Sequence, residues 1–435
     1  MSMFSYFKFD DRTDPKIKTA ARLSFLAFFG AAGWLSSIIN FSRSVLELDA
    51  FNFGIVLTVN ETAVIFGFII SILLAYISES RLLGILVAMA GTALILCAFA
   101  EFNNPAFSFL YTFVGKYVSI ATMNMAMFAF LLSLSVEYFE TTRDSLVKHS
   151  TDSGYTAVVM GKISAFSLLG TASGYFLVSL LGFLFSPKSG FFPLEYFYFL
   201  LYGILGLPLI VIGILSSKKA VAAKALKEHV EFIIRGKFLN FYILTFFTAS
   251  LNIIMIFFGA FFLVDKFSLS PGFIGLIFLL HSALVFFLRA KATEIMKSKG
   301  EDLTMKIRYI VSVVFFAVLI ISAFDFVDKD SPMKYVLLGI LALYGTTTLF
   351  DNSIKSFISY FATPNEQRSN LVIYTRLNQI AKIIIPILTG WLWIQYGSSA
   401  AFALGAIFSA ICLIVSFRIY SAYNDSDDGG IVEEG

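Results

Sequence analysis

The sequence predicts an all-α membrane protein with twelve transmembrane helices arranged in two groups of six. Three observations predict it: an apolar composition, twelve apolar runs of membrane length, and a long basic connection in the middle of the chain. Of the 435 residues, 58% are hydrophobic and only 14% are charged, and the mean hydropathy is +0.83. Soluble domains average about 45–50% apolar and about 25% charged residues. The composition therefore excludes a soluble enzyme, a disordered chain and a nucleic-acid-binding protein.

Twelve apolar runs are long enough to cross a bilayer, whose hydrocarbon core of about 30 Å needs about 20 helical residues. The first half of the chain holds runs at about 20–39, 53–76, 82–99, 107–135, 156–181 and 196–215. The second half holds runs at about 241–264, 273–288, 309–326, 335–358, 373–394 and 400–417. Each run is expected to form one spanning helix.

The basic residues predict the orientation of these helices. Of the 32 Lys and Arg residues, five fall in expected outer loops, five within spans, and the remaining 22 on the side of the two termini. Cytoplasmic loops carry the excess of basic residues in membrane proteins. Both termini are therefore predicted to be cytosolic, in a multi-pass protein of a bacterial inner membrane or a plasma membrane.

The domain organisation follows from the longest cytosolic connection, residues 216–237, which carries six basic residues. It predicts an N-terminal lobe at 1–215, a cytosolic linker at 216–237, a C-terminal lobe at 238–420 and a disordered acidic tail at 421–435. A short internal repeat supports duplicated halves, as found in many transporters. The fourth span ends in Tyr138-Phe139-Glu140-Thr141 and the tenth in Tyr360-Phe361-Ala362-Thr363.

Several motifs resemble those of the major facilitator superfamily. Residues 362–402, with Arg368, Gly390 and Tyr396-Gly397, resemble its tenth-to-eleventh loop and eleventh helix. The second span is also similar, with Phe53-Gly54-Ile55 at its outer start and Leu74-Ala75-Tyr76 at its cytosolic end. The following loop departs from the pattern, because Tyr76 stands where an Asp is expected and only Arg81 remains of the basic run. The fifth helix lacks the Gly-Pro pair of many exporters, and Gly170 and Gly174 give only a small-xxx-small spacing.

The resemblance implies two six-helix lobes around a central cavity that opens to each side of the membrane in turn. Helices 1, 4, 7 and 10 would line the cavity, helices 2, 5, 8 and 11 would lie at the lobe interface, and helices 3, 6, 9 and 12 would face lipid. Charged side chains are costly in hydrocarbon. As this geometry requires, spans 3, 6 and 12 carry no charged residue away from their ends, and span 9 carries none before Asp325.

Glu61 is the sharpest single signal, because it lies near the middle of the second span. A carboxylate removed from water takes up a proton more readily. One interpretation is therefore a proton-coupling carboxylate. The alternatives are a structural carboxylate paired with a basic group such as Lys116, or part of an outer gate.

Four further charged residues within spans are candidate site residues. Lys116 in the fourth span is expected either to contact a substrate anion or to form a structural ion pair. Asp351 and Lys355 share one face of the tenth span with Tyr344, in the favourable i, i+4 order for an ion pair. That pair either latches the lobes or is opened by substrate or proton. Lys382, about nine residues into the eleventh span, lies near mid-membrane.

Two uncharged or weakly basic residues complete the candidate site. Asn252 in the seventh span is expected to hydrogen-bond substrate. His281 in the eighth span is either a proton relay or a buried histidine with a structural partner. With only three His and two Cys in the chain, no metal site and no cofactor are expected.

The cavity tends towards positive charge, because Lys116, Lys355 and Lys382 face only two mid-span carboxylates, Glu61 and Asp351. Such a pocket favours an anionic solute. The sequence therefore predicts a secondary-active transporter, not an enzyme, that moves a small organic anion by proton symport. The expected partners are that solute, protons and the lipid bilayer, and the protein is expected to be a monomer. Alternatives are a proton-driven exporter of amphipathic compounds and a non-transporting membrane receptor on the same fold.

Overall fold

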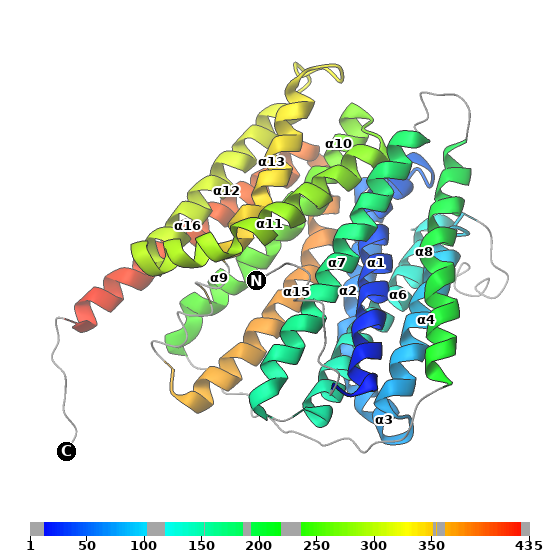
Figure 1. The fold of residues 1–435 in the computed structure, drawn as a ribbon. Coiled ribbons are helices and arrows are strands. Elements are labelled where there is room, and N and C mark those ends of the chain that lie inside the picture. The colour runs from blue at the N-terminus through cyan, green and yellow to red at the C-terminus, as the bar shows by residue number, and fades with distance from the viewer. Residues whose placement is uncertain are drawn as a thin grey trace, which may run out of the picture. The chain divides into compact units, whose positions relative to one another are not determined.

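The computed structural model describes residues 13–101, 118–151, 153–185, 193–218, 236–350, 354 and 362–427. Every regular element in these ranges is helical (Figure 1). The longer helices of the first half are α1 (Pro15–Ser44), α2 (Ala50–Thr62), α3 (Phe68–Tyr76), α4 (Glu79–Cys97), α6 (Ile120–Ser150), α7 (Ser153–Leu184) and α8 (Leu194–Ser217). Those of the second half are α9 (Leu239–Ile253), α10 (Gly259–Phe267), α11 (Pro271–Lys299), α12 (Glu301–Ala323), α13 (Met333–Thr347), α15 (Pro364–Tyr396) and α16 (Ser398–Asp427).

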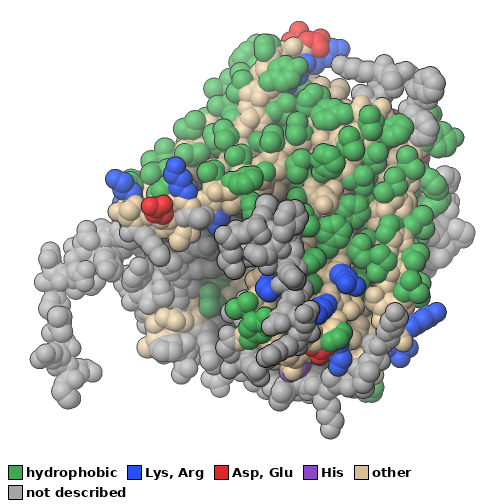
Figure 2. Space-filling model, in the orientation of Figure 1, with side chains coloured by type: hydrophobic (Ala, Val, Ile, Leu, Met, Phe, Trp, Pro, Cys, Tyr) green, Lys and Arg blue, Asp and Glu red, His purple; other side chains and the backbone are tan. Residues whose placement is uncertain are grey.

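Twelve stretches of described helix are long and apolar enough to cross a membrane, and each overlaps one of the twelve predicted runs. The surface agrees with this composition. In Figure 2, hydrophobic side chains cover most of the visible face, and charged side chains gather towards its edges. The predicted all-α, twelve-span architecture is confirmed.

Two helices extend beyond the predicted boundaries. The fourth span was expected at 107–135, but the described helix α6 runs from Ile120 to Ser150. The acidic tail was expected to begin at residue 421, but α16 continues to Asp427. In both cases an apolar run measures the part of a helix that crosses the membrane. The helix itself continues into polar sequence until its backbone hydrogen bonding stops. Most of the predicted linker lies outside the described residues.

The described helices form two compact units. The first comprises Met1–Glu228 together with Ser268–Leu279, and the second comprises His229–Phe267 and Leu280–Gly435. Residues 268–279 were expected in the C-terminal lobe, but they pack as part of the first unit, where the Asn40 side chain donates to the carbonyl oxygen of Leu269 at 2.7 Å.

Glycines bring two helix pairs of the first unit into backbone contact. On α4 and α8, a Cβ added at Gly84 would lie 2.6 Å from the Gly213 oxygen, and one at Gly206 would lie 2.6 Å from the Gly91 oxygen. On α7, a Cβ at Gly170 would collide with the carbonyl of Phe25 in α1. Small residues allow such close helix packing in membranes, where lipid supplies no hydrophobic driving force.

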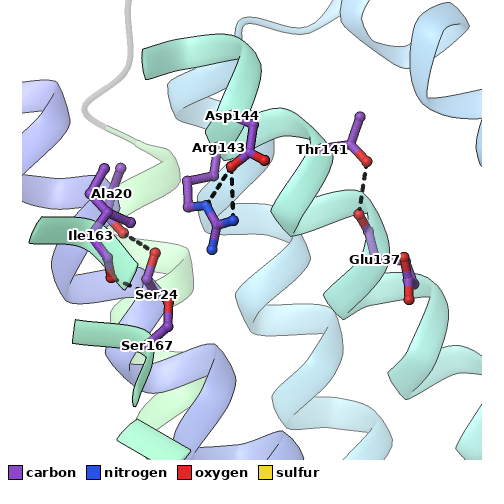
Figure 3. Close-up of polar contacts among 8 residues, drawn as sticks. All are labelled: Ala20, Ser24, Glu137, Thr141, Arg143, Asp144, Ile163 and Ser167. Atoms are coloured by element: carbon purple, nitrogen blue, oxygen red, sulfur yellow. Dashed lines mark hydrogen bonds and ion pairs between the residues drawn. The ribbon is translucent and has the colours of Figure 1, made fainter. Parts of the chain in front are cut away.

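Small polar residues in α1 and α7 satisfy themselves locally. The Ser24 hydroxyl donates to the Ala20 carbonyl at 2.8 Å, and the Ser167 hydroxyl donates to the Ile163 carbonyl at 3.3 Å (Figure 3). Each serine thereby pairs its hydroxyl within its own helix. These two hydroxyls therefore need no partner from another helix.

The second unit repeats the helix pairing of the first. In the first unit the first span (α1) packs on the fifth (α7), and the third (α4) on the sixth (α8). In the second unit the corresponding seventh span (α9) packs on the eleventh (α15), and the ninth (α12) on the twelfth (α16). This repeated pairing supports duplicated halves.

Candidate functional site

Three membrane spans change helix type part-way along their length. In the second span, 3-10 helix η2 (Ala63–Gly67) separates α2 from α3. In the seventh span, π-helix η6 (Ile254–Phe258) separates α9 from α10. In the tenth span, 3-10 helix η7 (Thr348–Phe350) follows α13. Such changes leave backbone groups to be satisfied by other partners, and they often mark functional positions in helices.

Predicted site residues lie at each of these changes. Glu61 lies two residues before η2, and Asn252 lies two residues before η6. In the tenth span, Asp351 follows directly after η7, but its own placement lies outside the described residues, as do those of Lys116 and Lys355. Two of the predicted site residues, Glu61 and Asn252, therefore lie beside a change of helix type.

Glu61 is partly buried in the first unit, and the Asn60 side-chain amide donates to its carboxylate at 3.4 Å. One turn further along, the Tyr138 hydroxyl of α6 donates to the Phe66 carbonyl within η2. The phenol therefore satisfies a carbonyl of the 3-10 segment, and it fastens the span that carries Glu61 to α6.

In the second unit, the structure brings two predicted residues together and adds a third. The Tyr344 hydroxyl on α13 donates to Asn252 Oδ1 on α9 at 3.1 Å. Arg308 on α12 donates from Nη2 to the same oxygen at 3.5 Å. Tyr344 and Arg308 are buried, with 0% and 1% of their surface exposed, whereas Asn252 is partly exposed.

A second layer of polar groups supports this cluster. The Thr248 and Tyr309 hydroxyls hydrogen-bond each other at 2.8 Å, and both are buried. The Arg308 guanidinium lies 5.8 Å from the centre of the Tyr309 ring. The Ser312 hydroxyl donates to the Arg308 carbonyl at 3.0 Å, one turn along the same helix. Polar side chains of three helices, α9, α12 and α13, thus hold the cluster together, and Asn252 is its partly exposed member.

Sequence reasoning missed Arg308, because it drew the ninth span at 309–326. The helix begins at Glu301, so the expectation that this span carries no charge before Asp325 is wrong. A signal was present: Thr304, Arg308 and Ser312 recur every four residues, which places them on one helix face. All three are buried.

His281 packs directly against α13. Its ring lies where a Cβ on Gly345 would be, with Nδ1 2.5 Å from that position, and it hydrogen-bonds the backbone of Leu341. These contacts favour the structural interpretation of His281 over the proton relay.

The predicted site residue Lys382 is exposed on α15.

A polar cluster in the first unit was not predicted. Glu79, at the start of α4, is only 3% exposed, and its Oε1 accepts from the Ser145 hydroxyl and lies 2.9 Å from His149 Nδ1 on α6. Nearby on α6, Arg143 pairs with Asp144 at 2.8 Å (Figure 3). The Glu79 contacts tie the last turns of α6 to the start of α4.

No protein-family model matches the sequence, and no curated protein matches it. Solved structures do. A bacterial homologue of the iron transporter ferroportin, in an inward-facing state, matches with a TM-score of 0.69 at 12% identity, over 96% of this chain and 99% of that one. A bacterial homologue of the human lysosomal transporter Spinster, inward-facing and occupied, matches with a TM-score of 0.66 at 11% identity, over 93% and 96%. The nucleoside transporter NupG matches with a TM-score of 0.63 at 15% identity, over 94% and 99%.

The chain has the major facilitator fold. The match extends over nearly the whole length of each neighbour and over 93–96% of this chain. The protein is therefore an integral, multi-pass membrane protein, as its composition predicted.

The neighbours on the major facilitator fold carry names as different as nucleoside transporter and iron transporter homologue. A fold shared at 11–15% identity does not specify a substrate. The function of this chain has to be argued from its own side chains, and the Arg308–Asn252–Tyr344 cluster is the best-defined polar site among the residues described.

Proposed function

We propose that this protein is a secondary-active transporter that moves a small organic anion across the membrane by alternating access, coupled to protons. It resides in a bacterial inner membrane or a plasma membrane, with both termini cytosolic. One observation carries the choice of substrate: a buried arginine, Arg308, contacts the partly exposed Asn252 at a π-helical segment of the seventh span.

The choice of an anion follows from the properties of arginine. Its guanidinium keeps its charge even when buried, so the field of Arg308 acts on the groups around it. Asn252, which accepts a hydrogen bond from Arg308, is partly exposed, so the positive potential of the guanidinium acts close to accessible space. A low-dielectric site of positive potential raises the local concentration of anions. Lys116 and Lys382 would add to this potential as further anion contacts.

The proton is assigned to Glu61. A carboxylate in a membrane span is costly when charged, and it gains from protonation as water is excluded. Its position beside the 3-10 segment η2 couples it to a part of the helix that departs from regular geometry. The Asp351–Lys355 pair would serve as a switch that opens when substrate or proton competes for one partner.

The test is flux into proteoliposomes that contain a pH-sensitive dye, screened against separate pools of carboxylates, phosphates, amino acids, sugars and cationic drugs. The proposal predicts proton movement with an anionic pool, and its loss in Glu61→Gln. Glu294→Gln is the control, because Glu294 is an exposed carboxylate on α11 and its loss leaves transport unchanged.

Other outcomes choose between the alternatives. Proton movement with cationic drugs alone contradicts the anion assignment and supports an exporter of amphipathic compounds. Absence of flux with every pool, from protein that elutes as a single species, contradicts transport and supports a receptor on the same fold.

A further inference from the structure

Two donors converge on one atom of Asn252. The Tyr344 hydroxyl and Arg308 Nη2 both donate to Asn252 Oδ1, at 3.1 and 3.5 Å. An amide oxygen only accepts hydrogen bonds and an amide nitrogen only donates them. The Tyr344 hydroxyl could also accept a hydrogen bond, but the Arg308 guanidinium only donates, so the contact with Arg308 requires the amide oxygen to face it.

The opposite end of the amide is open. Among the residues that the structure describes, the Asn252 nitrogen makes no hydrogen bond, and it is absent from the buried polar atoms that lack a partner. Since Asn252 is partly exposed, its two N–H donors point into accessible space. An oriented donor pair without a protein partner gains from a solute that brings an acceptor.

The wall behind the amide is rigid. Tyr344 and Arg308 are buried, and Tyr309 and Thr248 pack around them with a 2.8 Å hydrogen bond. Side chains packed in this way keep their rotamers. A rotation that exchanged the amide oxygen and nitrogen would place N–H donors against the Arg308 guanidinium, which cannot accept them. The arrangement holds a donor at one place before any solute arrives, which lowers the entropy cost of binding.

We infer that Asn252 is a specificity-determining residue whose side-chain nitrogen donates to an acceptor oxygen of the transported solute, such as a carboxylate or carbonyl oxygen. Tyr344 and Arg308 are positioning residues that hold the amide oxygen and so aim the nitrogen. The inference rests on the proposed function and deepens it, because it names the atom that hydrogen-bonds the transported solute.

The decisive change is Asn252→Asp, which replaces the two donors with acceptor oxygens in nearly the same shape. One carboxylate oxygen would keep the contacts with Arg308 and Tyr344, and the other would face the solute as an acceptor. A site that offers the wrong hydrogen-bonding group discriminates strongly against its former ligand. KM for the transported solute is expected to rise at least about tenfold. Asn252→Ala, which removes the donors without adding charge, is expected to raise KM by less.

The positioning role has its own readout. Tyr344→Phe removes one of the two contacts that orient the amide, so it is expected to raise KM several-fold with little change in kcat. In the double variant Asn252→Ala/Tyr344→Phe, KM should match that of Asn252→Ala alone, because the hydroxyl acts only through the amide. Tyr242→Phe is the matched control: Tyr242, also on α9, donates to the fully buried Asn370 at 2.8 Å, and its loss should leave KM unchanged.

The measurement is initial-rate uptake in proteoliposomes of whichever pool the wild-type protein moves, with melting temperatures in detergent to confirm that each variant folds. A carboxylate pool with KM unaltered in Asn252→Asp and Asn252→Ala overturns this inference and leaves the proposed function standing. A pool of neutral sugars with KM raised in both variants supports the inference and contradicts the anion assignment. Movement of cationic drugs alone, or no flux at all, overturns both.

Discussion

The hydroxyl of Tyr344, in the tenth span, donates to the side-chain oxygen of Asn252, in the seventh, at 3.1 Å. The sequence predicts both as site residues: Asn252 as a polar residue within the seventh span, and Tyr344 because it shares a helix face with Asp351 and Lys355. The contact places them in one site with Arg308, which also donates to the same oxygen.

Replacement of Arg308 by lysine should impair transport more than stability. Lysine keeps the charge but lacks the planar, multiply donating guanidinium that reaches Asn252. We expect kcat/KM to fall about tenfold, a loss of about 1.4 kcal/mol in transition-state stabilisation. Uptake assays on Arg308→Lys and on Arg289→Lys, an exposed arginine of α11, measure the difference. Equal activity of the two variants would refute a role for Arg308 in the site.

Glycine pairs should matter only where they close a helix contact. Gly206→Ala places a methyl group 2.6 Å from the Gly91 oxygen, so α4 and α8 must separate. Overpacking of this kind costs about 1–3 kcal/mol. Gly203→Ala, three residues earlier on the same helix, meets no atom within 4 Å and should keep or slightly raise the melting temperature. Equal melting temperatures for the two variants would contradict the described packing of α4 on α8.

The buried carboxylate of Glu79 should stabilise the first unit. Glu79→Ala leaves the Ser145 hydroxyl and the His149 ring without their acceptor. Because Ser145 is only partly buried and His149 is exposed, the loss should be that of ordinary hydrogen bonds, about 0.5–1.5 kcal/mol. Unfolding of the purified protein in detergent should show this decrease, whereas Glu101→Ala, at an exposed position, should leave stability unchanged. A stable Glu79→Ala protein would indicate that the cluster contributes little.

Lys266 should act as a helix cap and not as a substrate contact. Its Nζ donates to the carbonyl oxygens of Ser322 and Phe324, at 2.9 and 2.8 Å, at the end of α12. Cations at helix C-termini typically contribute about 0.3–1 kcal/mol. Lys266→Met should lower the melting temperature without altering KM, and Lys329→Met, an exposed lysine of the following loop, should change neither. A raised KM in Lys266→Met would place this residue in the transport site instead.

The number and place of the spans could be predicted from the sequence, because each helix that crosses a bilayer needs a run of about 20 apolar residues, and such runs are easily found in a sequence. The ends of α6 and α16 could not, since helices continue past the membrane into polar sequence at Ser150 and Asp427. Arg308 was lost for the same reason: the predicted span started one residue after it.

The candidate site could be predicted only in part. Polarity within a span selects Glu61, Asn252 and Tyr344, but it does not tell which of them meet. The Asn252–Tyr344 contact joins residues 92 positions apart in the chain, and nothing in the local pattern encodes it. The π-helical turn after Asn252 also leaves no local signature, because residues 254–258 contain neither Gly nor Pro.

The most direct test of proton-coupled anion transport is accumulation against a gradient. Proteoliposomes are loaded with the transported anion at the external concentration, and an inwardly directed proton gradient is then imposed. The account predicts that wild-type protein raises the internal concentration above the external one, and that Glu61→Gln exchanges internal for external anion but accumulates none. Accumulation by Glu61→Gln equal to that of the wild-type protein would contradict it.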